Sequence, residues 1–302
     1  MIEVIDNGGL TWYHILNPTD SDLNFLIKNF NFHPLDLDDT VSKTQRPKID
    51  VYEDYYFIIL HFPHFDNENL LIRINEVKIF WGKNYIITIG HVHWVVRELF
   101  HSAKENEIIR AGLMKDTSDH LLYKILERLL NESFTHLTKI GAEVDAINEK
   151  LFGKNAEEII EKISVTRRNI ILLDTIFKPQ LRLFTRFDTG EITGFAEDMD
   201  AYWGNILDMY QKIWDLTEDY EEIVEGFSKT FDSLQTNRTN EIVKVLTLIS
   251  SVLLPLTLIA SMYGMNIVLP FQEHPNAFWI VAGSMISVVV GLIVYFKSKK
   301  WM

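Results

Sequence analysis

The sequence of 302 residues contains no cysteine. This absence excludes disulfide scaffolds, zinc sites built from thiolates and cysteine nucleophiles. Basic residues are also scarce, because 29 Lys and Arg stand against 42 Asp and Glu and give a net charge of −13. Nucleic-acid binding needs a basic face that neutralises phosphates, so we expect neither DNA nor RNA as a partner.

Several sequence signatures are missing as well. The start, MIEVIDNGGLTW, has no basic segment followed by an apolar one, so we expect no cleaved secretory signal. The chain contains neither GxxxxGK[ST] nor GxGxxG, the patterns that cradle nucleotide phosphates. No Ser-His-Asp or paired-carboxylate spacing can be defended, and we expect neither an enzyme nor an organic cofactor.

Charge is absent from two long stretches near the C-terminus. Residues 245–272 carry no charged side chain, and a second charge-free run covers residues 277–296. A bilayer core of about 30 Å is crossed by about 20 helical residues, and both runs meet this length. The sequence therefore predicts a two-helix transmembrane hairpin. Two buried helices of a soluble core are disfavoured, because the rest of the chain is too small to wrap them.

The basic residues of the hairpin segment sit at its outer ends. Residues 242–302 contain four lysines against one glutamate, which leaves a net charge of −16 for the other 241 residues. Three of these lysines form the tail Lys297, Lys299 and Lys300, whereas the loop at 263–276 has no Lys or Arg. The positive-inside rule then predicts a multi-pass protein of the cell membrane with both termini in the cytoplasm.

The N-terminal part shows the pattern of a sheet with helices. A short helix capped by Thr19 or Asp20 is expected through Phe30. Strands are expected where residues rich in Ile, Val, Tyr and Phe run together or alternate, at 2–5, 10–16, 55–62, 70–81 and 84–92. We assign 1–110 to a cytoplasmic α/β domain, 111–241 to long cytoplasmic helices and 242–302 to the hairpin.

Long helices dominate the sequence after about residue 94. Apolar residues three and four apart predict one helix to about 151, and a second is expected to end near Lys178, before Pro179. A third runs from about Ala196 to Met262 without a strong breaker before the membrane. At 1.5 Å per residue such a helix would reach roughly 100 Å. A helix of that length needs neighbours, so we expect self-association.

One face of the first transmembrane helix mixes polar and apolar side chains. Steps of 100° per residue place on one stripe, with Leu246 at its border, the residues Asn240, Val243, Thr247, Ser250, Leu254, Thr257 and Ser261. In a symmetric bundle each becomes a ring, and hydroxyl and amide rings suit a hydrated cation. The alternative is that Ser and Thr bond back to their own backbone or mediate helix packing.

The stripe ends at Tyr263, Gly264, Met265 and Asn266. This Tyr-Gly-Met-Asn sequence after an apolar helix, followed by a short loop, one more span and a Lys-rich tail, resembles the CorA family of magnesium channels. The whole run TNEIVKVLTLISSVLLPLTLIASMYGMN is similar to that family, as is HPLDLDDTVSKTQRPKIDVYEDYYFIIL in the N-terminal part. The resemblance covers nearly the whole chain.

The resemblance implies a homopentamer whose subunits each carry an α/β/α sandwich in the cytoplasm. The long last helix would line the pore, and Asn266 would form the selectivity ring at the outer mouth, with Gly264 carbonyls nearby. Leu254, Leu246 and Val243 fall at the family's hydrophobic gate, with Asn240 below. Magnesium would be the transported ion and a regulatory one as well.

The resemblance also points to Glu273 in the outer loop as an electrostatic attractor of cations. For the regulatory cation site, between neighbouring cytoplasmic domains, it implies Asp39 and a partner position that falls on Asn205 here, with Asp208 as a possible substitute. A plainer interpretation makes Asp36, Asp38 and Asp39 a solvated helix start stabilised by the helix dipole.

Two other functions remain open from the sequence. A relative that moves Co²⁺, Ni²⁺ or Zn²⁺ would share the architecture, although Tyr-Gly-Met-Asn favours Mg²⁺. A membrane-anchored adaptor would have a hairpin that does not conduct. A metal site at His91 and His93 is possible, but surface or capping histidines are commoner.

Overall fold

The computed structural model describes residues 2–42, 45–66, 71–91, 93–115, 117–153, 155–266, 270 and 274–301. The chain divides into two compact units, Met1–Ser228 and Lys229–Met302. The domain boundaries expected from the sequence, after residue 110 and after residue 241, stay predictions.

A mixed sheet lies at the centre of the first unit. Its strand order is β1-β2-β6-β5-β4-β3, and only β2 and β6 run parallel. The strands are β1 Ile2–Asn7, β2 Leu10–Leu16, β3 Lys48–Val51, β4 Tyr55–Asp66, β5 Leu71–Gly82 and β6 Tyr85–Gly90. The five strands expected from the sequence are present, whereas the short edge strand β3 was not foreseen.

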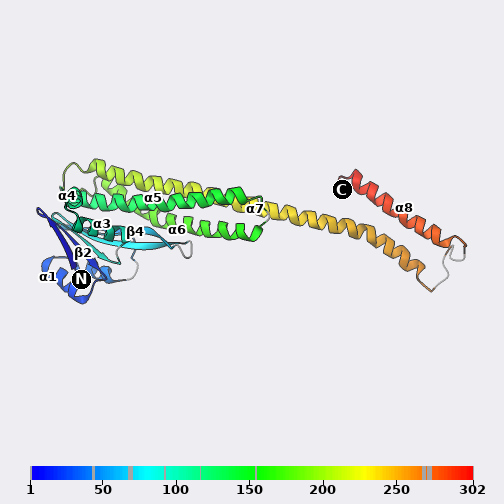
Figure 1. The fold of residues 1–302 in the computed structure, drawn as a ribbon, viewed down its shortest axis with the longest axis horizontal. Helices are drawn as coiled ribbons and strands as arrows, with labels where there is room; N and C mark the ends of the chain where they lie inside the picture. The colour runs from blue at the N-terminus through cyan, green and yellow to red at the C-terminus, as the bar shows by residue number, and fades with distance from the viewer. Residues whose placement is uncertain are drawn as a thin grey trace. The chain divides into compact units, whose positions relative to one another are not determined.

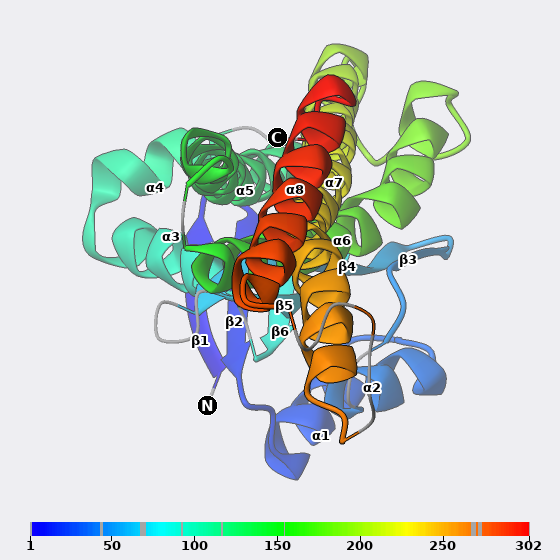
Figure 2. The same cartoon turned by 90° about the vertical axis from the view of Figure 1, so that its right-hand side faces the viewer.

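Helices cover both faces of this sheet (Figures 1 and 2). Alternating residues of β4 separate the two cores, since Phe57 and Ile59 pack with Leu26 and Leu37 of the first two helices. One face carries α1 Asp20–Asn29 and α2 Pro34–Val41; the other carries α3 Trp94–Glu105, α4 Glu107–Leu113, α5 Ser118–Lys150, α6 Ala156–Asp188 and the first part of α7 Asp200–Tyr263. The expected α/β/α sandwich is confirmed.

Helix α6 continues past Pro179, so the expected end near Lys178 is wrong. Proline removes one intrahelical hydrogen bond. The next residue, Gln180, is fully buried and anchors the helix on β4, because its amide nitrogen donates to the His61 carbonyl oxygen and its Oε1 accepts from the His61 N–H, both at 2.9 Å. With Phe184 also buried beyond the proline, packing offsets the lost bond.

Helix α7 begins at Asp200, four residues after the expected start. The carboxylate of Asp119 on α5 accepts hydrogen bonds from the backbone N–H groups of Phe195 and Ala196, at 2.8 and 3.2 Å. These contacts hold the chain in a loop before the helix. Once it begins, α7 buries Trp203 and Tyr210 at helical spacing in the first unit.

The second unit contains two helices long and apolar enough to span a bilayer. One is the later part of α7, and the other is α8, Ala277–Ser298. No residue of either apolar window is buried within the chain. A core helix of a soluble protein would be covered by its own chain, so these two helices need lipid or another copy as cover.

Candidate ion-conduction site

The polar stripe lies on the part of α7 that belongs to the second unit. The helix is continuous through Tyr263, so residues three and four apart share one face. Asn240, Val243, Thr247, Ser250 and the residues that continue the stripe are exposed in the single chain. Leu254 is 70% exposed, a large fraction for an apolar side chain. The stripe is thus available to a neighbouring chain or to an aqueous path.

Two hydroxyls of the stripe bond back to their own helix. Thr247 Oγ1 donates to the Val243 carbonyl oxygen, and Thr257 Oγ1 donates to that of Leu253, each at 2.8 Å. This is the backbone bonding that the sequence left open as an alternative. It uses the hydroxyl proton and leaves oxygen lone pairs as acceptors. Such oxygens can accept hydrogen bonds from the water shell of a cation.

The Tyr-Gly-Met-Asn sequence ends α7. The N–H of Gly264 donates to the Ala260 carbonyl oxygen at 3.0 Å, and a Cβ on Gly264 would lie 3.2 Å from that oxygen. A side chain there would crowd the last turn. Asn266 is exposed, and its amide has no hydrogen bond to any other residue that the structure describes. The amide is therefore free to bind water or a hydrated ion.

Two further groups expected at the membrane surface are Glu273 in the outer loop and the lysine tail after α8. Glu273 lies outside the described residues. At the other end of α8 the tail turns back, since the Trp301 N–H donates to the Phe296 carbonyl oxygen and the two rings stack at 6.1 Å. Lys297, Lys299 and Lys300 sit at this turn and are exposed. Aromatic and basic side chains together are typical of a membrane interface.

The side chain of Asp39, proposed as a regulatory metal ligand, is already paired. Lys48 Nζ lies 2.8 Å from Asp39 Oδ2 and also contacts Asp50. Partial burial lowers the pKa of Lys48, but the hydrogen bonds that its ammonium group donates to the two carboxylates outweigh this effect and raise the pKa overall. The ammonium group thus stays charged and competes with any divalent cation.

The first part of α7, which carries the partner position Asn205, lies on the opposite side of the sheet from α2 (Figure 2). Asn205 Nδ2 donates to the hydroxyl of Tyr123 at 3.1 Å, and this hydroxyl donates to Glu127 at 2.6 Å. Among the described residues, no group of three metal-ligating side chains converges. Asp39, Asn205 and Asp208 therefore do not form a divalent-cation site within one protomer.

The interpretation of Asp36 as part of a solvated helix start is wrong. Asp36 is 1% exposed and accepts hydrogen bonds from the hydroxyls of Tyr55 and Tyr52, at 2.8 and 3.3 Å. Burial raises the pKa of this carboxyl group, although the two tyrosines oppose the rise. The residue ties α2 to β4, so its role is structural.

Sequence reasoning missed a lysine from β5 that caps the C-terminal end of α2. Lys78 on β5 is buried, and its Nζ donates to the backbone carbonyl oxygens of Asp39 at 2.7 Å and Ser42 at 3.1 Å. The ammonium group caps the helix C-terminus, where a positive charge is favourable. No local sequence pattern predicts this contact, because it joins residues more than 35 positions apart.

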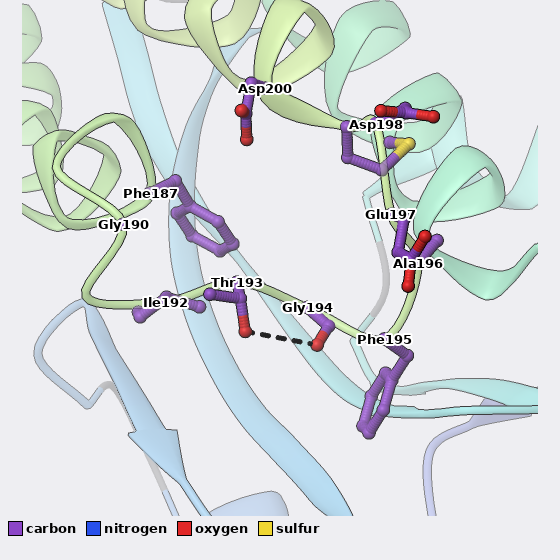
Figure 3. Close-up of a pocket in the computed structure, with 11 residues that line it drawn as sticks. Phe187, Gly190, Ile192, Thr193, Gly194, Phe195, Ala196, Glu197, Asp198 and Asp200 are labelled. Atoms are coloured by element: carbon purple, nitrogen blue, oxygen red, sulfur yellow. Dashed lines mark hydrogen bonds between the residues drawn. The ribbon is translucent and has the colours of Figure 1, made fainter.

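The loop between α6 and α7 lines an open pocket of about 410 Å³ (Figure 3). Its rim includes the acidic residues Glu197, Asp198 and Asp200 together with Phe187. Figure 3 marks the hydrogen bond from Thr193 Oγ1 to the Gly194 carbonyl oxygen, and the Gly190 N–H also donates to the Phe187 carbonyl oxygen at 3.1 Å. No set of polar groups converges on this pocket, so it gives no indication of a catalytic or ligand site.

Comparison with known proteins agrees with this geometry. A family model described as CorA-like Mg²⁺ transporter protein matches residues 7–299. The cobalt/magnesium transport protein CorA of Thermotoga maritima is 28% identical, with 98% of this chain and 85% of the relative covered. The putative metal ion transporter YfjQ of Bacillus subtilis is also 28% identical, with 99% and 93% covered.

A solved structure shares the fold. The complete structure of the CorA magnesium transporter from Methanocaldococcus jannaschii matches with a TM-score of 0.83 at 20% identity, covering 99% of this chain and 93% of that one. At this identity the match shows the fold, including the α/β domain, the long helix and the two C-terminal apolar helices.

Removing the ammonium group of Lys48 should make Asp39 more available to divalent cations. We expect Lys48→Gln to lower the Mg²⁺ concentration that raises the thermal unfolding midpoint, by about two- to fivefold, because the half-buried ammonium group competes with the cation for Asp39. The measurement is thermal unfolding of the detergent-solubilised chain at increasing Mg²⁺. Lys28→Gln, an exposed lysine on α1, is the control. An unchanged Mg²⁺ dependence would show that Asp39 is no ligand even when unpaired.

Proposed function

This chain belongs to the CorA-like Mg²⁺ transporter family, and we propose that it forms a homopentameric channel that carries Mg²⁺ into the cell. Membership of this family makes it a membrane transporter of divalent cations and not an enzyme. The finer features that follow, which are the assembly, the selectivity ring, the gate and its control, belong to the proposal.

The observation that carries the proposal is the stripe on α7. Neutral oxygen groups alternate there with aliphatic side chains, and the stripe runs to Asn266 without a carboxylate after residue 245. One two-helix hairpin cannot enclose a water-filled path. Five copies of α7 around one axis turn the stripe into rings and cover part of its exposed surface.

Selectivity follows from the hydration of Mg²⁺. This ion holds its first water shell tightly and dehydrates reluctantly. A ring of Asn266 amides, with Gly264 carbonyls nearby, can accept hydrogen bonds from the coordinated waters without removing them. Thr247, Ser250, Thr257 and Ser261 offer further neutral acceptors along the path. Tyr263 and Met265 complete the motif that holds the ring.

The proposed gate is aliphatic. Rings of Leu254, Leu246 and Val243 close a narrow pore by excluding water, with Asn240 as a polar ring beyond them. Transport is driven by the membrane potential, roughly 2.3 kcal/mol per charge per 100 mV and twice that for a divalent ion. This mechanism needs no nucleotide.

Orientation and control complete the proposal. The lysine tail, Lys297, Lys299 and Lys300, would hold both termini in the cytoplasm, and Glu273 would attract cations outside. Control by cytoplasmic divalent cations would have to act between protomers, because Asp39 and Asn205 lie on opposite sides of one sheet. It would also have to displace Lys48, so we derive no gating step through that site.

Another divalent cation is the main alternative cargo. One relative carries cobalt as well as magnesium in its name, and Co²⁺ is therefore a second candidate. Ni²⁺ and Zn²⁺ would pass the same architecture. The remaining alternative is a membrane-anchored adaptor whose hairpin does not conduct.

Flux into proteoliposomes tests the function directly. We expect the wild type to pass Mg²⁺ well above empty vesicles and Asn266→Ala to lose the preference for Mg²⁺ over Co²⁺, because the amide ring is removed. The measurement is the fluorescence of a metal-sensitive dye inside the vesicles, under an imposed inside-negative potential. Flux of Co²⁺, Ni²⁺ or Zn²⁺ without Mg²⁺ flux would indicate another cargo, and an absence of flux for all four ions would leave the adaptor. An unchanged ion preference in Asn266→Ala would remove the amide ring from the mechanism.

A matched pair of leucines tests the gate. Leu254→Thr places a hydroxyl in the stripe and should raise basal Mg²⁺ flux several-fold, because a hydrated constriction no longer closes by dewetting. Leu256→Thr makes the same change about 200° around the helix and should leave flux near the wild-type value. Equal effects of the two variants would contradict an aliphatic gate on this face.

The mass of the assembly tests the number of subunits. The detergent-subtracted mass should be about five times the chain mass of 35.3 kDa, near 177 kDa. Light scattering with refractive-index detection separates protein from detergent. A dimer or a tetramer would exclude the five-fold pore, even if Mg²⁺ flux were present.

A further inference from the structure

The side chain of His136 on α5 is buried without a hydrogen-bond partner. It is 4% exposed, and within the described part of the chain neither ring nitrogen finds a donor or acceptor. Buried polar groups in native proteins are almost always paired with protein, water or an ion. The imidazole therefore indicates a ligand that the protein chain itself does not supply.

A carboxylate stands one helical turn before this imidazole. Glu132 Oε1 lies 3.7 Å from His136 Nε2, which is too long for a hydrogen bond. Burial lowers the pKa of His136 to about 4, with smaller contributions from nearby Lys139, His93 and His64. The ring is therefore neutral at pH 7 and has a free lone pair. One cation placed between them can bind the imidazole lone pair of His136 and the carboxylate of Glu132 at the same time.

We propose that Glu132 and His136 bind a divalent transition-metal ion, with Zn²⁺ as the reference ion. Residues at i and i+4 lie side by side on a helix, the spacing that holds two metal ligands on one face. Imidazole nitrogen suits Zn²⁺, Co²⁺ and Ni²⁺, whereas Mg²⁺ prefers oxygen ligands. The site thus distinguishes transition metals from the main cargo of the proposed pore.

The distances fit this coordination after a small movement. Zinc binds nitrogen at about 2.0–2.1 Å and carboxylate oxygen at about 2.0–2.2 Å, so tetrahedral ligands lie roughly 3.4 Å apart. The present 3.7 Å is a few tenths of an ångström longer. The Glu132 side chain is 24% exposed, which leaves it room to close and gives the ion a route from solvent.

The neighbours limit the protein ligands to two. His93 is occupied, because its Nδ1 accepts from the Val95 N–H and its Nε2 lies 3.2 Å from the Pro63 carbonyl oxygen. Consistent with this, no cluster of three ligating side chains occurs among the residues with described positions. Water molecules fill the other coordination positions, so this is an exchangeable site and not a structural zinc.

The walls of the site fix its orientation and charge. The ring of Phe65 stacks on His136 with centroids 6.1 Å apart and planes at 21°. Lys139 Nζ lies 5.2 Å from the centre of the same Phe65 ring. Stacking holds the imidazole in place, and the ammonium group opposes cation binding. The charge of Glu132 favours metal binding and that of Lys139 opposes it. Removing one charge should therefore lower the metal affinity, and removing the other should raise it.

Zinc binding to the full-length protein in detergent tests this site. Excess Mg²⁺ is kept present so that oxygen-lined sites are occupied. Isothermal titration with Zn²⁺ should show that His136→Gln and Glu132→Gln each weaken binding by at least roughly tenfold, whereas Lys139→Gln strengthens it. X-ray absorption of the Zn²⁺-loaded wild type should show nitrogen scattering near the bond length given above, and His136→Gln should lose it.

The controls separate this site from the pore and from misfolding. His101→Gln removes a partly exposed imidazole from α3 and should bind Zn²⁺ like the wild type. Zn²⁺ should raise the thermal midpoint of the wild type but not of Glu132→Gln, an isosteric change at a partly exposed position. Equal Zn²⁺ affinity in wild type, His136→Gln and Glu132→Gln would overturn the site. Mg²⁺ flux should be unchanged in Glu132→Gln, so the two proposals fail independently.

Discussion

The apolar surface of α7 and α8 that the chain itself leaves uncovered is the constraint on which the molecule depends. Their membrane-crossing windows contain no buried residue. Water is an unfavourable neighbour for this surface, so a bilayer must cover most of it. Lipid cannot satisfy Asn240 or the hydroxyls on the same helix. The polar stripe therefore needs neighbours other than lipid. Further copies of α7 around a water path would provide them.

The first unit pairs charges internally around α2. Lys78 caps the helix carbonyls, and Lys48 pairs with Asp39. Both lysines occupy positions where backbone or carboxylate oxygens attract a cation. This arrangement explains how the acidic segment can be stable without a bound metal. It also means that a divalent cation would have to displace a covalently tethered competitor, which is entropically costly for the incoming ion.

The sequence predicted features whose signal is local and repeated. Two charge-free runs gave the membrane helices, apolar runs gave five strands, and Thr19 was a correct cap, since its hydroxyl accepts from the Asp22 N–H. It failed where a distant contact overrides a local signal. Hydrogen bonds between Gln180 of α6 and His61 of β4 carry α6 past a proline, and two tyrosines bury Asp36. The pairing of Asp39 with Lys48 joins α2 to β3, an edge strand too short to recognise from the sequence. The stripe on α7 was predictable as a pattern, but its role depends on neighbours that one sequence does not specify.

The acidity of the chain has a place on α7 itself. Trp203 and Tyr210 bury one face of this helix, whereas the exposed residues of the opposite face include Asp208, Asp215 and Asp219. Because α7 is one continuous helix from Asp200 to Tyr263, this face belongs to the same element as the proposed pore. In the proposed pentamer five such faces would lower the electrostatic potential on the cytoplasmic side, which favours cations over anions there. In that pentamer the negative net charge would serve transport, because it would attract a divalent ion without binding it tightly at a single site.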